Sequence, residues 1–338
     1  MIGASIDAAL DRCNTLRLPS RADALLRPTT IEELRGAVDW ALGRRAPITV
    51  LGGGSNVVLR ARVSGCVIMP AIASIHVERD ATGARVTAGA GVVWHDLVRF
   101  CLGQGLYGLE NLALIPGRVG AAPIQNIGAY GAELERTFES LTAVSCRDAT
   151  LDTMGKAECG FGYRNSIFKG ARRNELVIAS VTLRLQSIAQ PCVDYPDVRR
   201  RLAAMGSAIT PVSVAEAVTR IRRSKLPDVN RVPNAGSFFK NPLLQAKQLD
   251  ALRGHLPDVP TYPGDGGIKV AAAYLIDRAG WKGRSLGPAA VWHRQPLVLI
   301  NRGGARADDM LRLADAIRDD IGSRYGIALE MEPQLLGD

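Results

Sequence analysis

A glycine-rich segment in the first sixth of the chain carries the first residues suited to chemistry. It reads Leu-Gly-Gly-Gly-Ser-Asn over residues 51–56 and lies between two short stretches of β-type residues. Consecutive glycines let main-chain N–H groups approach a ligand without interference from side chains, and such groups form an anion-binding nest. A tight hairpin turn would use the same residues, so this segment by itself leaves both interpretations open.

The second glycine-rich segment runs from Ile115 to Gly131, inside a stretch (106–131) that has little helical or strand periodicity. Irregular stretches of this length in compact domains are usually functional. The amides of Gln125 and Asn126, with the small residues around them, would admit a flat ring. Together the two segments are suited to a pyrophosphate and the aromatic head of a cofactor, although neither proves it alone.

Other chemical patterns are weak or absent. Gly103, Gly105 and Gly108 have the spacing of a dinucleotide-binding loop, but they follow a predicted helix, so we interpret them as a helix end and a turn. The sequence has no GxxxxGK[ST] phosphate-binding loop and no GxSxG nucleophile elbow. Its six cysteines and four histidines are dispersed, which predicts reduced thiols and no catalytic metal.

The charge of the chain favours an anionic partner. Lys and Arg number 42 and Asp and Glu number 33, so the net charge is +9. A phosphorylated small molecule fits this excess, and a solvated basic face is the alternative. Aromatic residues make up only 5% and do not interleave with the basic segments, so nucleic acid is not expected. No apolar run approaches the ~20 residues of a membrane span, and no signal-peptide pattern is present, which predicts a cytoplasmic protein without membrane contact.

The regular elements that position these segments are short and mixed, which is typical of an α+β fold. Two capping boxes, Thr30–Glu33 and Ser213–Glu216, predict helix starts. Helices are expected over 31–44, 92–102, 213–224, 244–253, 269–279 and 307–321. Strands are expected over 48–51, 57–59, 66–69, 75–78, 85–88, 141–146, 176–185, 297–300 and 327–331.

A series of motifs, taken together, resembles the UDP-N-acetylenolpyruvoylglucosamine reductase family, the MurB family of flavoenzymes. The motifs are LGGGSN (51–56), GLENLALIPGRVGAAPIQNIGAYG (108–131), FGYRNSIFK (161–169), KLPD (225–228), NAGSFFKNP (234–242), IKVAAAYLIDRAGWKG (268–283), LVLIN (297–301) and LEMEP (329–333). They occur in the family order, and neither chance nor a merely shared fold would reproduce all of them.

The resemblance implies an α+β fold, with an FAD-binding region of the vanillyl-alcohol-oxidase (PCMH) type and a C-terminal α+β substrate-binding domain. The implied boundaries are 14–190 for the FAD-binding region, with two subdomains split near 70, and 191–212 for a connecting loop that carries Tyr195. The substrate-binding domain is expected over 213–326, and a C-terminal strand over 327–338 is expected to return to the flavin site. A monomer is favoured.

The resemblance also implies two half-reactions on noncovalently bound FAD. NADPH, as co-substrate, first reduces the flavin, and the reduced flavin then passes a hydride to C3 of the enolpyruvyl group of a UDP-sugar. The product is UDP-N-acetylmuramate, a precursor of peptidoglycan. By resemblance, Arg164 stabilises the enolate, Glu332 pairs with Arg164, and Ser237 gives the proton to C2. Taken singly, these residues have plain alternatives: a surface ion pair, a solvated strand residue and a turn hydroxyl.

The remaining site residues are also carried over by resemblance. Cofactor contacts are implied for Gly52, Gly53, Gly54, Ser55, Asn56, Pro116, Gly117, Gly120, Gln125, Asn126, Gly128, Ala129, Tyr130 and Gly131. Substrate contacts are implied for Tyr195, Arg222, Lys225, Asn241, Tyr262 and Gln295. Tyr195 matches a loop tyrosine that closes over the nucleotide in the longer, loop-bearing branch of the family.

Some positions depart from the family pattern. Pro333 and Gln334 follow Glu332, where the family usually has a β-branched residue and often a basic one. Glu330 lies on the same face as Glu332 if the strand has a period of two, and it is the alternative to Glu332. Two other functions stay open beside the reductase: an FAD-dependent sugar oxidase of the same fold, and a flavin-free protein that binds acidic nucleotides or RNA.

Overall fold

The computed structural model describes residues 3–264 and 266–338. The chain forms two compact units, and each unit is assembled from separate stretches of the sequence. Unit 1 contains residues 3–8, 22–53 and 63–224, and unit 2 contains residues 9–21, 54–62 and 225–338. Each unit is described by itself.

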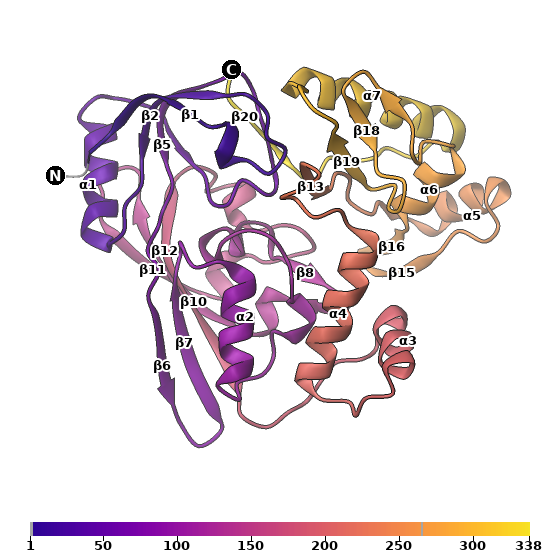
Figure 1. Cartoon of the computed structure of the whole chain (residues 1–338), viewed down its shortest axis with the longest axis horizontal. Helices are drawn as coiled ribbons and strands as arrows, with labels where there is room; N and C mark the ends of the chain where they lie inside the picture. The colour runs from indigo at the N-terminus through magenta and orange to yellow at the C-terminus, as the bar shows by residue number, and fades with distance from the viewer. Residues whose placement is uncertain (1–2, 265) are drawn as a thin grey trace. The chain divides into compact units, whose positions relative to one another are not determined.

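Unit 1 contains two large β-sheets (Figure 1). The first has the strand order β1-β2-β5-β3, in which β3 and β5 are parallel, and the second is antiparallel with the order β11-β10-β12-β7-β6. The strands are β1 (Ser5–Ala9), β2 (Arg21–Leu26), β3 (Ile48–Val50), β5 (Arg62–Ile68), β6 (Ile75–Arg79), β7 (Gly83–Gly89), β10 (Phe138–Ser145), β11 (Leu151–Gly155) and β12 (Leu176–Gln186), with a short pair, β8 (Gly128–Ala129) and β9 (Ala132–Glu133).

The central strand β12 separates two apolar clusters in unit 1. Val177 and Ala179 pack in a cluster with residues of α1, whereas Ile178 packs in a second cluster with residues of α2 and α4. The helices of unit 1 are α1 (Ile31–Leu42), α2 (Trp94–Gly103), α3 (Pro196–Met205) and α4 (Pro211–Lys225), whose last residue belongs to unit 2. Thr30 caps α1 as predicted, because its hydroxyl oxygen accepts a hydrogen bond from the N–H of Glu33 at 3.1 Å.

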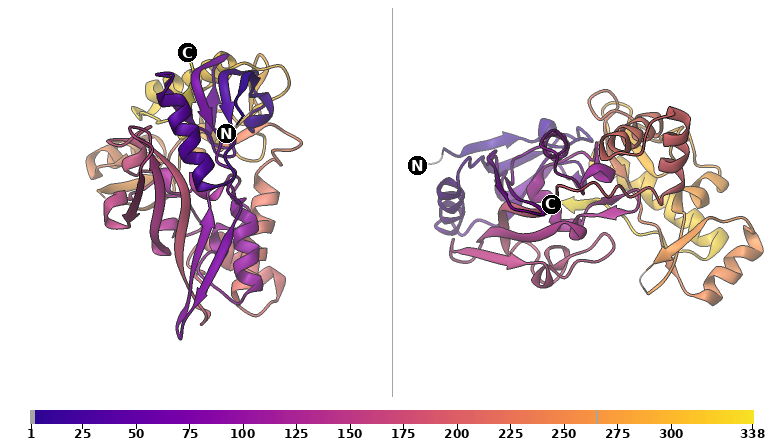
Figure 2. Two further views of the ribbon diagram at one scale, coloured as in Figure 1. Left: turned by 90° about the vertical axis from the view of Figure 1, so that its left-hand side faces the viewer. Right: turned by 90° about the horizontal axis from the view of Figure 1, so that it is seen from below.

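The segment 191–224 differs from the expectation of a connecting loop followed by the start of a second domain. It contains α3, and it leads into α4, whose apolar face (Val214, Val218 and Ile221) is buried in the core of unit 1 with residues of α2. Figures 1 and 2 show α4 lying beside α2. The apolar spacing along α4 explains this placement, since it forms one continuous stripe on the helix.

The start of α4 also differs from the predicted capping box Ser213–Glu216. The helix begins at Pro211, and Thr210 is the cap: its hydroxyl oxygen accepts from the N–H of Ser213 at 3.1 Å, and the Ser213 hydroxyl oxygen accepts from the N–H of Thr210 at 2.9 Å. Glu216 instead pairs with Arg220 on the helix surface.

Gly105 ends α2, as predicted. Its φ is +67°, the N–H of Leu106 donates to the carbonyl of Cys101, and the N–H of Gly105 donates to the carbonyl of Leu102. This pair of hydrogen bonds is a Schellman motif, so the glycines at 103–108 form a helix end and not a dinucleotide-binding loop.

Unit 2 contains a four-stranded sheet with the order β13-β19-β18-β17, a three-stranded sheet with the order β14-β16-β15, and a parallel pair of β20 with β4. Its strands are β4 (Val57–Leu59), β13 (Asn234–Ser237), β14 (Leu243–Leu244), β15 (Thr261–Gly264), β16 (Gly267–Val270), β17 (Ser285–Leu286), β18 (Ala289–Val291), β19 (Val298–Asn301) and β20 (Gln334–Leu336). Its helices are α5 (Ala246–His255), α6 (Ala272–Arg278) and α7 (Ala307–Tyr325).

The predicted strand over 327–331 was wrong. Ile327 and Leu329 alternate with exposed residues and pack into the core of unit 2, but the main chain there forms only an isolated bridge, between Met331 and Phe239. The strand that forms is β20, which pairs in parallel with β4. Alternating burial indicated an extended chain, whereas the strand itself depends on a main-chain partner far away in the sequence.

Residues 9–21 belong to unit 2, although residues from 14 onward were expected in the FAD-binding region. The buried amide of Asn14 donates to the carbonyls of Leu10 and Leu18 and so fixes this segment as a compact turn. The Asn301 amide donates to the carbonyl of Leu16 at 2.9 Å, which joins the segment to β19. In the part of the chain that the structure describes, no helix is long and apolar enough to cross a membrane, and no group of metal-binding side chains occurs.

Candidate active site

The two glycine-rich segments pack directly against each other in unit 1. A Cβ atom on Gly52 would lie 3.0 Å from the Cβ of Ala121, and a Cβ atom on Gly53 would lie 3.0 Å from the Cα of Gly117. Both distances are shorter than ordinary packing allows, so main-chain approach favours glycine at both positions. The contact joins the segments 51–56 and 115–131, which the sequence assigned to one cofactor.

The segment 51–56 is not a hairpin turn, since β3 before it pairs with β5 and β4 after it pairs with β20. Among residues 3–264 and 266–338, the N–H groups of Gly52, Gly53 and Gly54 donate no hydrogen bond to the chain. Main-chain donors seldom stay without an acceptor, and consecutive ones fit the oxygens of a pyrophosphate. These residues therefore fit the pyrophosphate of FAD.

The first residues of α2 position the second glycine-rich segment. The indole N–H of Trp94 donates to the carbonyl of Leu112 at 3.0 Å, and its main-chain N–H donates to the carbonyl of Gly117 at 3.0 Å. The N–H of Leu114 donates to Nδ1 of His95 at 2.9 Å. Two adjacent side chains thus fix the main chain at Leu112 and Leu114, and the main chain of Trp94 fixes it at Gly117.

Close packing continues at the other small residues of this segment. A Cβ atom on Gly120 would lie 2.5 Å from the Cβ of Ala90, and the N–H of Gly120 donates to the carbonyl of Ala90. The main chain at Gly131 has a φ of +82°, which favours glycine. Of the other predicted cofactor positions in unit 1, Pro116 precedes Gly117, Gln125 ends the 3₁₀ turn Pro123–Gln125, and Ala129 lies in β8.

The side chain of Asn126 is used by the fold itself. Asn126 is fully buried, its amide group donates to a carboxylate oxygen of Glu133 at 3.2 Å and to the carbonyl of Gly162 at 3.3 Å, and its side-chain oxygen accepts from the N–H of Glu135. The Asn126 amide therefore shapes the turn that follows, and a cofactor contact of this residue stays a prediction.

Arg164 lies against that turn. Its Nη2 donates to the carbonyl of Gly128 at 2.6 Å, and a Cβ atom on Gly128 would lie 2.9 Å from Nη1 of Arg164. The main chain of Arg164 has a φ of +53°, an uncommon conformation for a residue with a side chain. The predicted catalytic arginine is thus fixed beside a predicted cofactor segment.

A second cluster joins Tyr130, Tyr195 and Arg222. The two tyrosine rings meet edge to face with their centroids 5.3 Å apart. Arg222 is hydrogen-bonded to the hydroxyl oxygen of Tyr130, and its Nε donates to the carbonyl of Leu114 at 3.2 Å. The structure therefore brings together one predicted cofactor residue and two predicted substrate residues, which lie far apart in the sequence.

This cluster is electropositive. Burial lowers the pKa of Arg222, and the positive charge of Arg164 lowers it further, although the Tyr130 oxygen opposes both. Burial also raises the pKa of Tyr130. The positive charges of these two guanidinium groups repel each other, so an anionic ligand would stabilise both. This suits a substrate phosphate or carboxylate.

Asn111 joins two segments of this cluster, and sequence reasoning gave it no role. It is buried, and its amide group donates to the carbonyl of Tyr130 at 2.9 Å and to the carbonyl of Cys192 at 3.0 Å. Because Cys192 lies three residues before Tyr195, this one amide positions the segment that carries Tyr195 beside Tyr130. The sequence signal that could have indicated this role is a polar residue inside the apolar part of the motif GLENLALIPG.

We expect Asn111→Leu to lower the free energy of unfolding by about 1–3 kcal/mol, because two carbonyls lose their donor. The Cys192 thiol, which is half-buried in the native chain, should then react faster with an alkylating reagent. Cys146 is also half-buried, but burial raises the pKa of its thiol to about 11, which slows its reaction. Labelling followed by peptide mapping measures the alkylation rate of each cysteine. The variant Cys192→Ala identifies the labelled peptide that contains Cys192. Unchanged alkylation of Cys192 in Asn111→Leu would contradict this role.

In unit 2, the main chain joins Ser237 to Glu332. Ser237 ends β13 opposite Val298 of β19, and the N–H of Glu332 donates to the carbonyl of Phe238 at 3.0 Å. The Asn56 amide donates to the carbonyl of Glu332 at 3.4 Å, and the carbonyl of Asn56 accepts from the N–H of Gln334. Three predicted site residues of unit 2 thus lie on adjacent main-chain segments, and the last of them belongs to the glycine-rich motif.

Ser237 follows an irregular point in its strand. The pairing of β13 with β19 shifts register between Asn234 and Ser237, and Gly236 between them has a φ of +70°. The Asn234 side-chain oxygen accepts from the N–H of Gly236 at 2.9 Å. Bulges of this kind redirect a side chain out of the regular sheet pattern.

Glu330, the alternative to Glu332, has different surroundings. Its side chain is 71% exposed and pairs with Lys240. Glu332 is half-buried. The remaining predicted substrate residues of unit 2 lie on separate elements. Lys225 ends α4, Tyr262 is exposed in β15, and Gln295 lies in the turn before β19. Asn241 lies just before β14, and its side-chain oxygen accepts from the N–H of Ala272, the first residue of α6.

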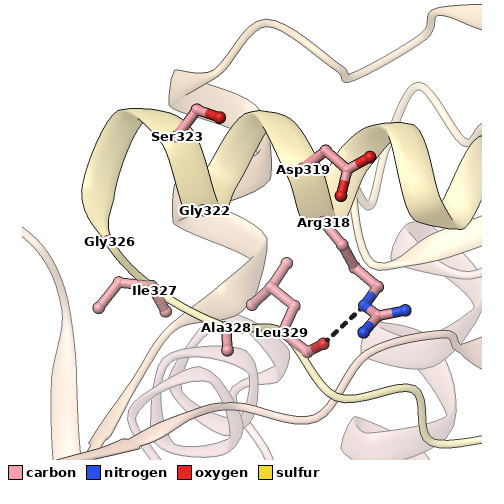
Figure 3. Close-up of a pocket in the computed structure, with 8 residues that line it drawn as sticks. All are labelled: Arg318, Asp319, Gly322, Ser323, Gly326, Ile327, Ala328 and Leu329. Carbon is pink, nitrogen blue, oxygen red and sulfur yellow. Dashed lines mark hydrogen bonds between the residues drawn. The ribbon is translucent and has the colours of Figure 1, made fainter.

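Unit 2 also has a shallow groove of about 600 Å³ along the end of α7 and the segment that follows it (Figure 3). It is lined by Arg318, Asp319, Gly322, Ser323, Gly326, Ile327, Ala328 and Leu329, and Arg318 donates to the carbonyl of Leu329 within it. None of the predicted site residues lines this groove, so it is separate from the residues assigned to chemistry.

Comparison with known families matches both parts of the chain. Residues 22–153 match the family model of an FAD binding domain, and residues 227–336 match that of the C-terminal domain of UDP-N-acetylenolpyruvoylglucosamine reductase. The predicted fold class, an α+β fold with a PCMH-type FAD-binding region and a C-terminal domain, is confirmed.

Similar proteins match along almost the whole chain. The UDP-N-acetylenolpyruvoylglucosamine reductase of Azoarcus sp. (strain BH72) is 49% identical over 334 residues, which cover 97% of this chain and 96% of that protein. The protein of the same name from Bordetella pertussis (strain Tohama I) is 50% identical over 325 residues, which cover 95% of this chain and 92% of that protein.

Solved structures agree with this relationship. The UDP-N-acetylenolpyruvylglucosamine reductase (MurB) of Thermus caldophilus has a TM-score of 0.68 and 26% identity and covers 99% of both chains. The 6-hydroxy-D-nicotine oxidase of Arthrobacter nicotinovorans has a TM-score of 0.54 and 14% identity, covers 91% of this chain and 82% of that chain, and shares the fold alone. The chain therefore belongs to the UDP-N-acetylenolpyruvoylglucosamine reductase family.

Proposed function

We propose that this protein reduces UDP-N-acetylglucosamine enolpyruvate to UDP-N-acetylmuramate, with FAD bound noncovalently and NADPH as the reductant. The observation that carries the proposal is the relationship, at about 50% identity and over nearly the full length, to proteins named for this reaction. We propose further that the enzyme acts as a cytoplasmic monomer in the synthesis of peptidoglycan precursors.

Two features of unit 1 support a site for FAD. The unpartnered N–H groups of Gly52 and Gly53 suit the pyrophosphate, and the contact of Gly53 with Gly117 joins that segment to the small residues suited to the flavin ring. When bound, FAD supplies the hydride that it has received from NADPH. The mechanism requires the chain to bind and orient the substrate, to stabilise negative charge and to deliver a proton.

We assign the stabilisation of charge to Arg164 and Glu332. As hydride reaches C3 of the enolpyruvyl group, the C2–C3 double bond becomes single and an electron pair appears at C2, delocalised into the carboxylate. A guanidinium group is always charged and can bind both carboxylate oxygens, and the bond from Arg164 to Gly128 orients it. Glu332, when protonated, donates a hydrogen bond to the same carboxylate.

We assign the proton to Ser237. Its hydroxyl gives a proton to C2, and the resulting alkoxide is reprotonated from solvent, so that hydride and proton together add one H₂ equivalent to the double bond. A serine is a weak acid in water, so this role depends on its placement beside a much more basic carbanion. The irregular point at Gly236 supports such a placement.

The half-reactions can be tested separately by flavin absorbance without oxygen. NADPH should bleach the flavin band, and the enolpyruvyl substrate should then restore it. Bleaching without recovery would overturn the proposed substrate and favour an oxidase of the same fold. A colourless protein that takes up no FAD would overturn the flavoenzyme assignment altogether.

Arg222→Ala and Lys225→Ala are expected chiefly to raise KM for the UDP-sugar, by roughly 10- to 100-fold, because each removes a charge-assisted hydrogen bond to an anion. Steady-state kinetics at saturating NADPH measure this effect. Arg220→Ala is the matched control, since Arg220 lies on the same helix and pairs with Glu216 at the surface. An unchanged KM in either variant would remove that residue from the substrate site.

A further inference from the structure

His95 is linked to a predicted substrate residue through a single main-chain unit. Nδ1 of His95 accepts from the N–H of Leu114 at 2.9 Å, and the carbonyl of Leu114 accepts from Nε of Arg222 at 3.2 Å. His95 lies near the start of α2, and Arg222 lies near the end of α4, so Leu114 joins two helices of unit 1. Because Nδ1 is the acceptor, the proton of the neutral ring is on Nε2.

Leu114 has a main-chain conformation that needs support. Its φ is +59°, which costs energy for any residue with a side chain. The hydrogen bond from its N–H and the hydrogen bond to its carbonyl stabilise this conformation from both sides. Without an acceptor at His95, the peptide can relax toward negative φ, and the carbonyl then turns away from Arg222.

The carbonyl of Leu114 determines where Arg222 can point. Its bond to Nε fixes the plane of the guanidinium group, and the Arg222 side chain is also hydrogen-bonded to Tyr130. The fork geometry of arginine means that a fixed Nε also fixes the directions of the remaining donors. The group is thereby oriented before any ligand binds.

We propose that His95 is a positioning residue for substrate binding: through Leu114 it orients the guanidinium group of Arg222 toward an anionic group of the substrate. The inference rests on the proposed function, because it takes Arg222 as a substrate-binding residue. His95 itself needs no contact with substrate or cofactor.

The charged groups around His95 support its neutral form. Burial is the main cause that lowers the pKa of His95 below its ordinary value of 6.5, and the positive charges of Arg99, Arg223 and Arg222 lower it further. Asp96 on the same helix opposes them. At neutral pH the ring is therefore an acceptor. In acid it gains a proton at Nδ1, so that two donors face each other and the hydrogen bond from the N–H of Leu114 is lost.

Two substitutions distinguish the effect of the hydrogen-bond acceptor from the effect of side-chain size. His95→Asn places an amide oxygen where Nδ1 lies and does not titrate, whereas His95→Leu has no acceptor. At pH 8 we expect KM for the enolpyruvyl substrate to rise about tenfold in His95→Leu and by less than about threefold in His95→Asn, with kcat nearly unchanged. As the pH falls below 6.5 toward the lowered pKa of His95, the KM of the native enzyme should rise relative to that of His95→Asn.

A second readout does not depend on turnover. The substrate is titrated into the oxidised, FAD-loaded enzyme without NADPH, and the perturbation of the flavin spectrum gives Kd. This Kd should follow the same order among the variants, and FAD content and Tm confirm that each variant is folded. In the double variant His95→Leu/Arg222→Ala, the loss of His95 should add less than twofold to the effect of Arg222→Ala.

Several outcomes would overturn the inference. Equal KM and Kd for His95→Asn and His95→Leu would mean that the acceptor is irrelevant. A parallel pH dependence of the native enzyme and His95→Asn would exclude the role of the His95 proton. Fully additive effects of His95→Leu and Arg222→Ala would separate the two residues. If Arg222→Ala alone leaves KM unchanged, the substrate assignment of Arg222 fails, whereas FAD reduction and reoxidation still test the proposed reaction independently.

Discussion

Ser237→Ala is expected to leave the reduction of the flavin by NADPH intact and to slow its reoxidation by the enolpyruvyl substrate about 10²- to 10⁴-fold, the range of a lost general acid. The two half-reactions separate because only the second one needs a proton at C2. The fold should tolerate the change, since Ser237 pairs with Val298 through its main chain and lies in the half-buried end of β13.

Rapid mixing under anaerobic conditions measures both half-reactions from the flavin absorbance. Ser285→Ala is the matched control, because Ser285 is an exposed serine of β17 in the same sheet. Both its rates should stay within about twofold of the native values, as expected of an exposed surface substitution. Equal slowing of the two half-reactions in Ser237→Ala would refute its role as proton donor and would indicate a general disturbance of the site.

Local signals in the sequence predicted the elements whose ends depend on nearby residues. Thr30 and Glu33 predicted the start of α1, and Gly105 predicted the end of α2, because caps and left-handed turns need only a few adjacent residues. The start of α4 was misplaced because two capping patterns overlap in Thr210–Glu216. Pro211 at the first helical position was the signal that distinguishes them.

Elements that depend on distant partners could not be predicted in the same way. Apolar residues at every second position around Leu329 indicated an extended chain. The strand that forms is β20, and it pairs with β4, almost 280 residues away in the sequence, so local residues could not predict it. The boundary between the units also lies inside the motif 51–56, between Gly53 and Gly54. A motif shared by two units has no composition change at its middle, so a linear division of the chain missed it.

The candidate site shows the same limit. Family motifs pointed to Arg164 and Tyr130, whose residue types suggest their chemistry. They gave no role to His95 or Asn111, which act on main-chain groups far away in the sequence. A buried hydrogen bond from a side chain to a distant carbonyl leaves no periodic pattern, so its partner becomes visible only in three dimensions.

Glu332→Gln is the second substitution expected to have a large effect. Glutamine keeps the size of the side chain and can still donate a hydrogen bond, but it has no acidic proton. We expect flavin reoxidation by the enolpyruvyl substrate to slow roughly 10²- to 10³-fold, the range for removing one group that stabilises developing charge. Reduction by NADPH should be unchanged, because no charge develops on the enolpyruvyl group in that step.

Glu330→Gln is the control that tests which glutamate is the right one. Glu330 is exposed and pairs with Lys240 at the surface, where an ion pair contributes little, so its loss should change neither half-reaction by more than about twofold. The main chain of Glu332, in contrast, is bonded on one side to Phe238, next to Ser237, and on the other to Asn56. If Glu330→Gln slows reoxidation and Glu332→Gln does not, the acid lies two residues earlier, and the adjacency of Glu332 to Ser237 has only a structural meaning.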